Sequence, residues 1–259
     1  MELFHFDPGM FLSFLLVFIR VSMVLFLLPF IGGTGLPTMA KAALCIVITL
    51  AIWPEVKFSP DYFPTNVLSL GLTFLGELLL GLIVSIIIRS IFSAVQTAGE
   101  IIGFQMGFSM MNIIDPLSGG SVSLISQFLY IVAILIFLTL NGHIFLIKVF
   151  LESFKYIPPG TFLINHTVFD NILFYSSQIF VMAVKIAAPV MAIELLISFS
   201  FAIIARIAPQ INILFVGFPI KIAVGLFFLG ILFNLIVYFL KHAMIDLNQT
   251  FLSIYTSLR

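Results

Sequence analysis

Residues 222–240 read IAVGLFFLGILFNLIVYFL and contain no Asp, Glu, Lys or Arg. Residues 21–40 and 116–147 are equally free of these charged side chains. Backbone N–H and C=O groups have no water to bond inside a bilayer, so only helices or closed barrels satisfy them. The three runs are continuously apolar rather than alternating, which is typical of helices and not of barrel strands. The sequence therefore predicts an all-α integral membrane protein.

The composition of the whole chain supports this prediction. Of the 259 residues, 62% are hydrophobic and only 8% are charged, whereas soluble domains have about a quarter charged residues. Eleven Lys and Arg balance eleven Asp and Glu, so no basic surface is available and we expect no nucleic-acid partner. The single cysteine, Cys45, excludes a disulfide framework and is read as a small buried apolar residue.

About six apolar segments follow one another along the chain. A bilayer is spanned by about twenty residues. By that measure the second segment (38–53) is short, and the third (66–98) and fifth (168–205) are too long for a single span. These uneven lengths predict hairpins and tilted helices rather than six matched spans, and Pro189 predicts a kink in the fifth segment. The segments lie near residues 10–30, 38–53, 66–98, 121–151, 168–205 and 213–245.

Three glycines form the most specific local pattern. Gly99, Gly103 and Gly107 recur at every fourth residue, so on a helix they lie in one stripe where another backbone can approach closely. The pattern predicts a helix-packing contact. Packing within the chain and contact with a partner both satisfy it.

A methionine-rich segment follows the glycines. Asp115-Pro116 and Gly119-Gly120 are incompatible with a straight helix, yet the preceding residues are too apolar for a solvated loop. Irregular backbone at membrane depth is tolerated where it is buried or lines a cavity, and flexible methionines suit a constriction that seals and yields. A pore loop and a loop docked at the interface are equally compatible with this composition. The candidate plug residues are Met106, Phe108, Met110, Met111, Asn112, Asp115, Pro116, Gly119 and Gly120.

Charged residues also lie inside or at the ends of the apolar segments, where charge is costly and indicates a function or a partner. Glu77 and Arg89 are twelve residues apart, as are Glu194 and Arg206, which places each pair about 120° apart on a helix. Each charge therefore needs a partner outside its own helix. Structural pairing between helices and an ion or proton path are the two interpretations. The predicted buried charges are Arg20, Glu77, Arg89, Lys185, Glu194 and Arg206.

No catalytic or metal-binding pattern is visible. The four histidines are scattered, and the chain has no His-Glu-x-x-His motif, nucleophile elbow or phosphate-binding loop. We therefore expect no enzyme activity, no metal and no cofactor. Residues 241–259 alternate apolar and polar side chains in a helical pattern, which predicts an amphipathic helix that continues the last segment.

Several short motifs, taken in order, resemble the FliR family of bacterial flagellar export-gate proteins, whose relatives serve virulence-type type III secretion. The resemblance spans nearly the whole chain. Its motifs are Arg20-Val-Ser with Pro29, Gly35-Leu-Pro37 with Lys41, the glycine stripe leading into Asp115-Pro116, Asn141-Gly-His143, Arg206-Ile-Ala-Pro209-Gln210-Ile-Asn212 and Gly217-Phe-Pro219-Ile-Lys221.

This resemblance implies a single export-gate domain, P-like over residues 1–120 and Q-like over residues 121–259. It implies assembly with the P and Q subunits, FliP and FliQ, into a helical complex at the flagellar basal body in the bacterial inner membrane. Neighbouring subunits would then cover many of the apolar helices, with membrane lipid as a further partner. FlhA, FlhB and unfolded protein substrates in transit are the other implied partners.

The family's plug loop corresponds to residues 106–121, which favours the pore-loop interpretation of the methionine-rich segment. The alternative is a secondary transporter of a small solute or ion, suggested by the charges inside apolar segments.

Overall fold

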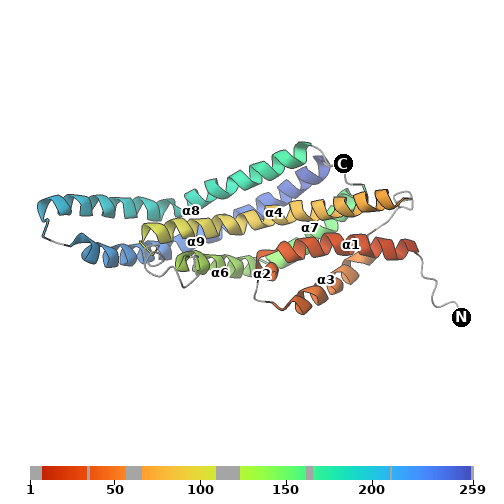
Figure 1. Ribbon diagram of the computed structural model, residues 1–259, viewed down its shortest axis with the longest axis horizontal. Helices are drawn as coiled ribbons and strands as arrows, with labels where there is room; N and C mark the ends of the chain where they lie inside the picture. Colours follow the sequence, from red (N-terminus) through yellow and green to blue (C-terminus); the bar gives the residue numbers. More distant parts are fainter. Residues whose placement is uncertain are drawn as a thin grey trace. The chain divides into compact units, whose positions relative to one another are not determined.

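The computed structural model describes residues 8–33, 36–56, 66–108, 123–161, 166–210 and 212–257, and these contain helices but no strand. This result confirms the prediction of an all-α protein. Figure 1 shows the order of the elements. They are α1 (Pro8–Leu27), α2 (Pro29–Gly32), α3 (Thr38–Ile52), the short 3₁₀ helix η1 (Trp53–Glu55), α4 (Val67–Gln105), α6 (Leu124–Thr139), α7 (Gly142–Tyr156), α8 (His166–Ile207) and α9 (Ile213–Ser257).

Five of the described helices are long and apolar enough to cross a membrane, and a bent pair, α6 with α7, makes a possible sixth span. The prediction of a membrane protein with about six apolar segments is therefore confirmed. As expected from their lengths, α4 with 39 residues and α8 with 42 residues exceed a single perpendicular crossing, which takes about twenty. The last segment continues as one helix to Ser257, as the pattern of its C-terminal part predicted.

The fourth predicted segment is two helices rather than one. α6 and α7 are bent by 70°, and the bend lies at Asn141, whose φ of 58° places it in the left-handed region. Asparagine tolerates this conformation better than most side chains because it is short and polar. The continuous apolar run therefore did not reveal the bend.

The chain forms two compact units. Unit 1 contains residues 1–90, 141–176 and 244–259, and unit 2 contains residues 91–140 and 177–243. Each unit thus combines segments from both halves of the sequence, and α4, α8 and α9 contribute to both. This division rests on contacts within one chain. The P-like and Q-like parts, residues 1–120 and 121–259, stay a prediction.

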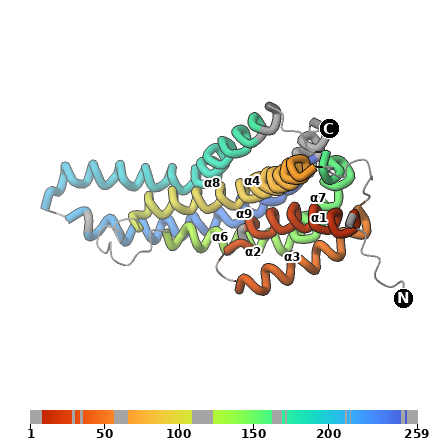
Figure 2. The backbone as a smooth tube through the Cα atoms, turned by 45° about the vertical axis from the view of Figure 1, so that its right-hand side comes forward, coloured from red at the N-terminus to blue at the C-terminus, as the bar shows by residue number. Residues whose placement is uncertain are grey.

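In unit 1, α3 runs beside α1 (Figures 1 and 2). The indole N–H of Trp53 donates to the Ser13 hydroxyl over 3.0 Å, and its ring meets Phe14 edge to face at 5.9 Å between centroids. α1 also packs against α4 at Gly81, where an added Cβ would lie 2.8 Å from the Cβ of Met23. The absence of a side chain at Gly81 therefore permits this approach.

The core of unit 2 is formed by the end of α4 and by parts of α6, α8 and α9. Phe92 of α4 meets Phe137 of α6 at 5.3 Å between ring centroids, and Phe128 of α6 meets Phe233 of α9 at 5.9 Å. Edge-to-face aromatic pairs of this kind add about 1 kcal/mol each beyond the area they bury. Fully buried apolar residues of α4 and α6 in this unit include Ala94, Val95, Ala98, Ile102, Leu129 and Ala133.

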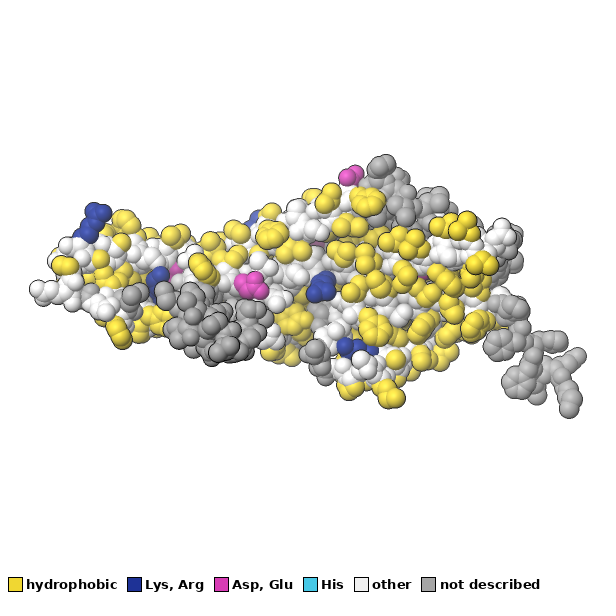
Figure 3. Space-filling view, viewed as in Figure 1, with side chains coloured by type: hydrophobic (Ala, Val, Ile, Leu, Met, Phe, Trp, Pro, Cys, Tyr) yellow, Lys and Arg dark blue, Asp and Glu magenta, His cyan; other side chains and the backbone are white. Residues whose placement is uncertain are grey.

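Large apolar side chains are also exposed on the single chain. Phe180 of α8 is 69% exposed and Phe215 of α9 is 81% exposed, and hydrophobic side chains dominate the face seen in Figure 3. Soluble monomers rarely expose extended apolar patches. This surface fits lipid, partner helices or both.

Candidate functional site

The methionine-rich segment begins where α4 ends, and a glycine, Gly107, terminates the helix. Gly107 has a φ of +87°, a conformation that residues with a side chain rarely adopt. The N–H of Phe108 donates to the carbonyl of Gly103, and the N–H of Gly107 donates to that of Phe104, both over 3.0 Å. This pattern is a Schellman motif, which satisfies the last carbonyls of a helix and stops it.

The base of the segment is anchored in unit 2. Met106 is fully buried and packs on Gly225 of α9, where an added Cβ would lie 2.6 Å from the Cγ of Met106. Gly107 lies against Phe218, whose ring would be 2.9 Å from an added Cβ. The segment therefore starts from a fixed point. The other predicted plug residues, Met110, Met111, Asn112, Asp115, Pro116, Gly119 and Gly120, lie outside the described residues.

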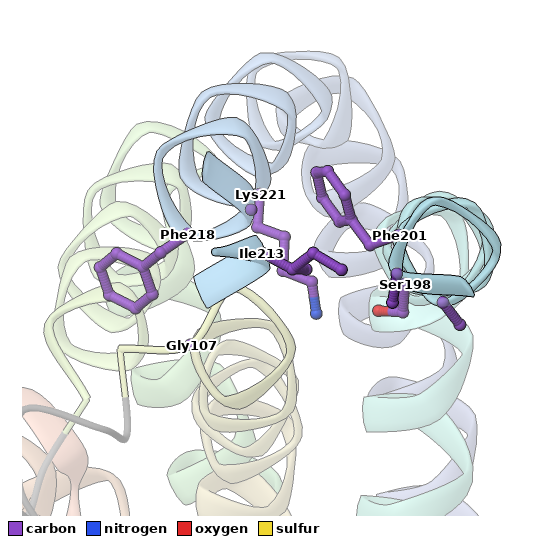
Figure 4. A pocket seen from close by; sticks show the side chains of 9 residues that line it. Gly107, Ser198, Phe201, Ile213, Phe218 and Lys221 are labelled. Atoms are coloured by element: carbon purple, nitrogen blue, oxygen red, sulfur yellow. The ribbon is translucent and has the colours of Figure 1, made fainter. Parts of the chain in front are cut away.

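A pocket of about 350 Å³ opens beside Gly107. It lies between α8 and α9, and Figure 4 shows Phe201 and Ser198 on α8 with Lys221 and Phe218 on α9. Among its described lining residues, only Ser198 and Lys221 carry polar side chains. The lining is otherwise apolar and consists of Gly107, Phe201, Ala202, Ala205, Ile213, Gly217 and Phe218.

Two of the three predicted packing glycines, Gly99 and Gly103, lie against the start of α6. An added Cβ on Gly99 would lie 2.5 Å from the Cα of Ser126 on α6, and one on Gly103 would collide with the Ser123 hydroxyl. The Ser126 hydroxyl also donates to the carbonyl of Gln96 over 3.0 Å. The close helix contact thus occurs within the chain. Gly107 differs from the predicted stripe because it ends the helix instead of lying on it.

Arg20 and Glu77 form an ion pair in the interior of unit 1. The Nε of Arg20 lies 2.6 Å from a carboxylate oxygen of Glu77, and both side chains are almost fully buried. The pair joins α1 to α4. Two charges in a low-dielectric interior are stable only when their remaining donors and acceptors are also satisfied.

The turn after α7 satisfies those groups. Both Nη atoms of Arg20 donate to the carbonyl of Ile157 over 3.2 Å, and one also donates to the Ser153 hydroxyl over 3.3 Å. The backbone N–H of Gly160 donates to the second oxygen of Glu77 over 3.0 Å. The guanidinium also stacks 4.2 Å above the centre of the Phe154 ring, a favourable cation–π geometry.

Sequence reasoning identified Arg20 and Glu77 but not their neighbours. Residues 157–160 lie between the fourth and fifth predicted segments, and the sequence there does not indicate that the Ile157 carbonyl and the Gly160 N–H point inward. Backbone groups carry no residue-specific signal, so only the tertiary structure reveals them.

Glu194 is buried without such partners. It is 0% exposed, and neither carboxylate oxygen has a hydrogen-bond partner in the described part of the chain. Lys221 of α9 is the cation whose charge acts on it. An isolated buried carboxylate is energetically costly. Within the described part of unit 2, the Glu194 carboxylate and the Ser123 hydroxyl are therefore buried side-chain groups without a hydrogen bond, and the carboxylate is the charged one.

The remaining predicted charges are on the surface of the single chain: Arg89, Lys185 and Arg206 are exposed and not buried within it. Lys41, by contrast, is nearly buried and donates to the carbonyls of Gly32 and Gly33 over 3.2 and 2.7 Å. Its ammonium thereby caps the carbonyl end of α2, where a positive charge is favourable.

No group of three or more His, Cys, Asp and Glu side chains that could hold a metal occurs among the residues whose positions are described.

Comparison with known proteins covers most of the chain. Residues 11–247 match the family described as bacterial export proteins, family 1. The flagellar biosynthetic protein FliR of Escherichia coli K12 is 31% identical over 224 residues, which cover 86% of this chain and 85% of that protein.

FliR of Bacillus subtilis is 33% identical over 230 residues, 88% of each chain. FliR of Buchnera aphidicola from Acyrthosiphon pisum is 34% identical over 209 residues, 80% of each chain. The chain therefore belongs to the FliR family of bacterial export proteins and is a membrane component of the flagellar export apparatus.

Proposed function

We propose that this chain is a structural and gating subunit of the flagellar type III export channel, located at the basal body in the inner membrane. The observation that carries the proposal is the family match over residues 11–247. The apolar surface supports it, because exposed Phe180 and Phe215 need lipid or partner helices around them. No step in this function requires catalysis by the chain.

The methionine-rich segment closes the passage in this proposal. Two observations support this role: the Schellman motif at Gly107 and the buried Met106 side chain. Both give the segment a rigid starting point. Methionine side chains are unbranched and flexible, so a cluster of them can seal around a passing chain and close again. The segment would act on unfolded protein substrates without recognising a particular sequence.

The partners in this proposal are the P and Q subunits, FliP and FliQ, with FlhA and FlhB beside the assembled gate. The environment of Glu194 supports the proposal of a partner subunit. Its carboxylate has no hydrogen bond within the described chain, and a buried charge is normally paired. A cationic side chain from a neighbouring subunit would complete it. The exposed apolar faces of α8 and α9 would be covered in the same assembly.

Deleting Met110–Gly119 tests the gating role. We expect the assembled complex to form in normal yield while the membrane becomes leaky to ions and small solutes, because the seal is gone but its anchor remains. The measurement is solute release from vesicles that contain the purified complex. The matched control replaces the same ten residues (positions 110–119) with a Gly-Ser chain of equal length. Assembled complexes with an unchanged leak would refute the plug.

A secondary transporter is the competing function, and the buried Glu194 near Lys221 is the observation that favours it. The two functions differ in the expected assembly. Purification in mild detergent should yield a large hetero-oligomer if the chain is a gate subunit. A monomer or small homo-oligomer that moves a solute alone would support the transporter.

A further inference from the structure

One face of α9 lies against the end of α4. Phe218 meets Gly107, and Gly225 meets Met106. Phe218 and Gly225 are seven residues apart on α9, which is close to two turns of an α-helix, so both lie on the same face. All four residues belong to unit 2. Two consecutive residues at the end of α4 are therefore held by one face of a second helix.

The contact at Gly225 has no room for a side chain. An added Cβ would lie 2.6 Å from the Cγ of Met106 and 2.8 Å from both its Sδ and its Cε. Met106 is 0% exposed, and Gly225 is buried as well. A side chain at position 225 would occupy the space that the Met106 thioether fills, because a close-packed interior has few voids. Gly225 thus forms a seat for Met106.

The contact at Gly107 fixes the direction in which the chain leaves α4. The φ of Gly107 is +87°, and Figure 4 shows the Phe218 ring beside this glycine. A residue with a side chain would be strained at this φ, and its Cβ would lie 2.9 Å from the ring. The ring therefore fills the place that only a glycine leaves open.

Another glycine of α9 has no such contact. An added Cβ on Gly230 would meet nothing within 4 Å, and Gly230 is exposed. Glycine inside a helix costs stability relative to alanine, so α9 itself gains nothing from a glycine at position 225. The requirement for glycine there arises from Met106 at the end of α4.

We propose that Phe218 and Gly225 are positioning residues of the gate, which set the point and the direction from which the methionine-rich segment starts. This role rests on the gating function proposed above. Met106 and Gly107 come directly before that segment in the chain, so a displacement of either is passed on to it through the covalent backbone. α9 thereby controls the seal without contributing a residue to the plug.

The test is solute release from vesicles that contain the purified complex, measured per assembled complex. Gly225→Val forces Met106 out of its seat, and overpacking of this kind should raise the population with a displaced plug, and the release rate with it, about tenfold. Gly230→Val on the same helix is the matched control and should leave the release rate unchanged. Combining Gly225→Val with Met106→Ala removes as many heavy atoms as the valine adds, so it should restore the seal.

A second variant tests the other contact without adding an atom to the interior. Phe218→Ala takes the ring away from Gly107, so the complex should assemble in normal yield and the release rate should rise by a smaller factor. If neither Gly225→Val nor Phe218→Ala assembles, both contacts serve the fold, and the positioning role is refuted.

Deletion of Met110–Gly119 separates a failure of the positioning role from a failure of the plug. If the deletion leaks but Gly225→Val and Phe218→Ala seal as well as the unaltered complex, α9 does not position the gate. If the deletion does not leak, the plug itself is wrong and the positioning role falls with it. A leak in Gly225→Val that Met106→Ala fails to reverse would also overturn the seat at Gly225.

Discussion

Unit 1 and unit 2 each bury a carboxylate, and they treat it in opposite ways. Glu77 in unit 1 has an ion pair with Arg20 and a hydrogen bond from the Gly160 N–H. Glu194 in unit 2 is equally inaccessible but has no hydrogen bond within the described chain. The difference is between an interior that satisfies its buried carboxylate within the chain and one that leaves its buried carboxylate without a hydrogen bond in the described residues.

The two carboxylates differ in their effect on stability, because burying an unpaired charge costs free energy. A satisfied pair such as Arg20 with Glu77 selects one arrangement of α1, α4 and the turn after α7, because any other arrangement leaves a charge without a partner. An unsatisfied carboxylate such as Glu194 lowers the stability of the single chain. The first is a feature of folding, and we propose that the second is resolved on assembly with a partner.

The largest expected effect comes from breaking the pair in unit 1. Arg20→Met leaves Glu77 buried and uncompensated, so we expect a loss of about 3–5 kcal/mol in the free energy of unfolding. Urea unfolding of the detergent-purified chain, followed by the fluorescence of its single tryptophan, measures this effect. Trp53 contacts Phe14 of α1, so its signal reports on unit 1.

The double variant Arg20→Met with Glu77→Leu is the matched control. It removes both charges, so most of the lost stability should return, because replacing both members of a buried pair by apolar residues is often neutral. If Arg20→Met unfolds at the same urea concentration as the unaltered chain, the ion pair does not contribute this free energy of unfolding.

An intermediate effect is expected at the glycine contact, which tests whether unit 2 is otherwise well packed. Gly99→Ala places a methyl group 2.5 Å from the backbone of Ser126, so we expect a loss of about 1–3 kcal/mol. Gly71→Ala on the same helix meets nothing within 4 Å and should gain up to about 1 kcal/mol from helix propensity. The temperature at which half of the detergent-purified chain aggregates compares the two.

If both alanine variants behave alike, α6 does not approach α4 as closely as described, and the packing of unit 2 would be loose. A loss confined to Gly99→Ala would mean that Glu194 is unsatisfied inside a unit whose other contacts are tight.

The smallest effect on the chain itself is expected for Glu194→Gln. The amide is neutral, so the isolated chain should gain about 1 kcal/mol or less by losing a buried charge. The yield of the complex with its partners should nevertheless fall, because the partner's cation then meets no carboxylate. Both quantities are measured from one detergent extract, by unfolding of the free chain and by the amount of co-purified complex. An unchanged complex yield would argue against pairing across an interface.

Much of the fold could be read from the sequence. Long, predominantly apolar segments located the long helices of the described chain, because helix formation in lipid is required by the backbone and needs only enough apolar residues in a row. Gly99 and Gly103 identified the tight contact for a similar reason, since a missing side chain permits a close approach in any fold.

The bend at Asn141 and the end of α4 at Gly107 were not predicted. An apolar run reports that residues avoid water but not the direction of the chain, and the left-handed residue at each position is allowed by its side chain without being required. The third glycine of the stripe therefore had two possible roles, and only the tertiary contacts select between them.

By itself, the sequence determined that this protein consists of apolar helices in a membrane, that charged residues lie within those helices, and that the FliR pattern runs along it. Only the tertiary structure decided that Arg20 meets Glu77, that the turn after α7 completes the pair, and that Glu194 is left without a partner in the described chain. The physical reason is the range of each interaction. Burial in lipid depends on the composition of a local stretch, whereas pairing of charges depends on residues that lie 57 positions apart for Arg20 and Glu77.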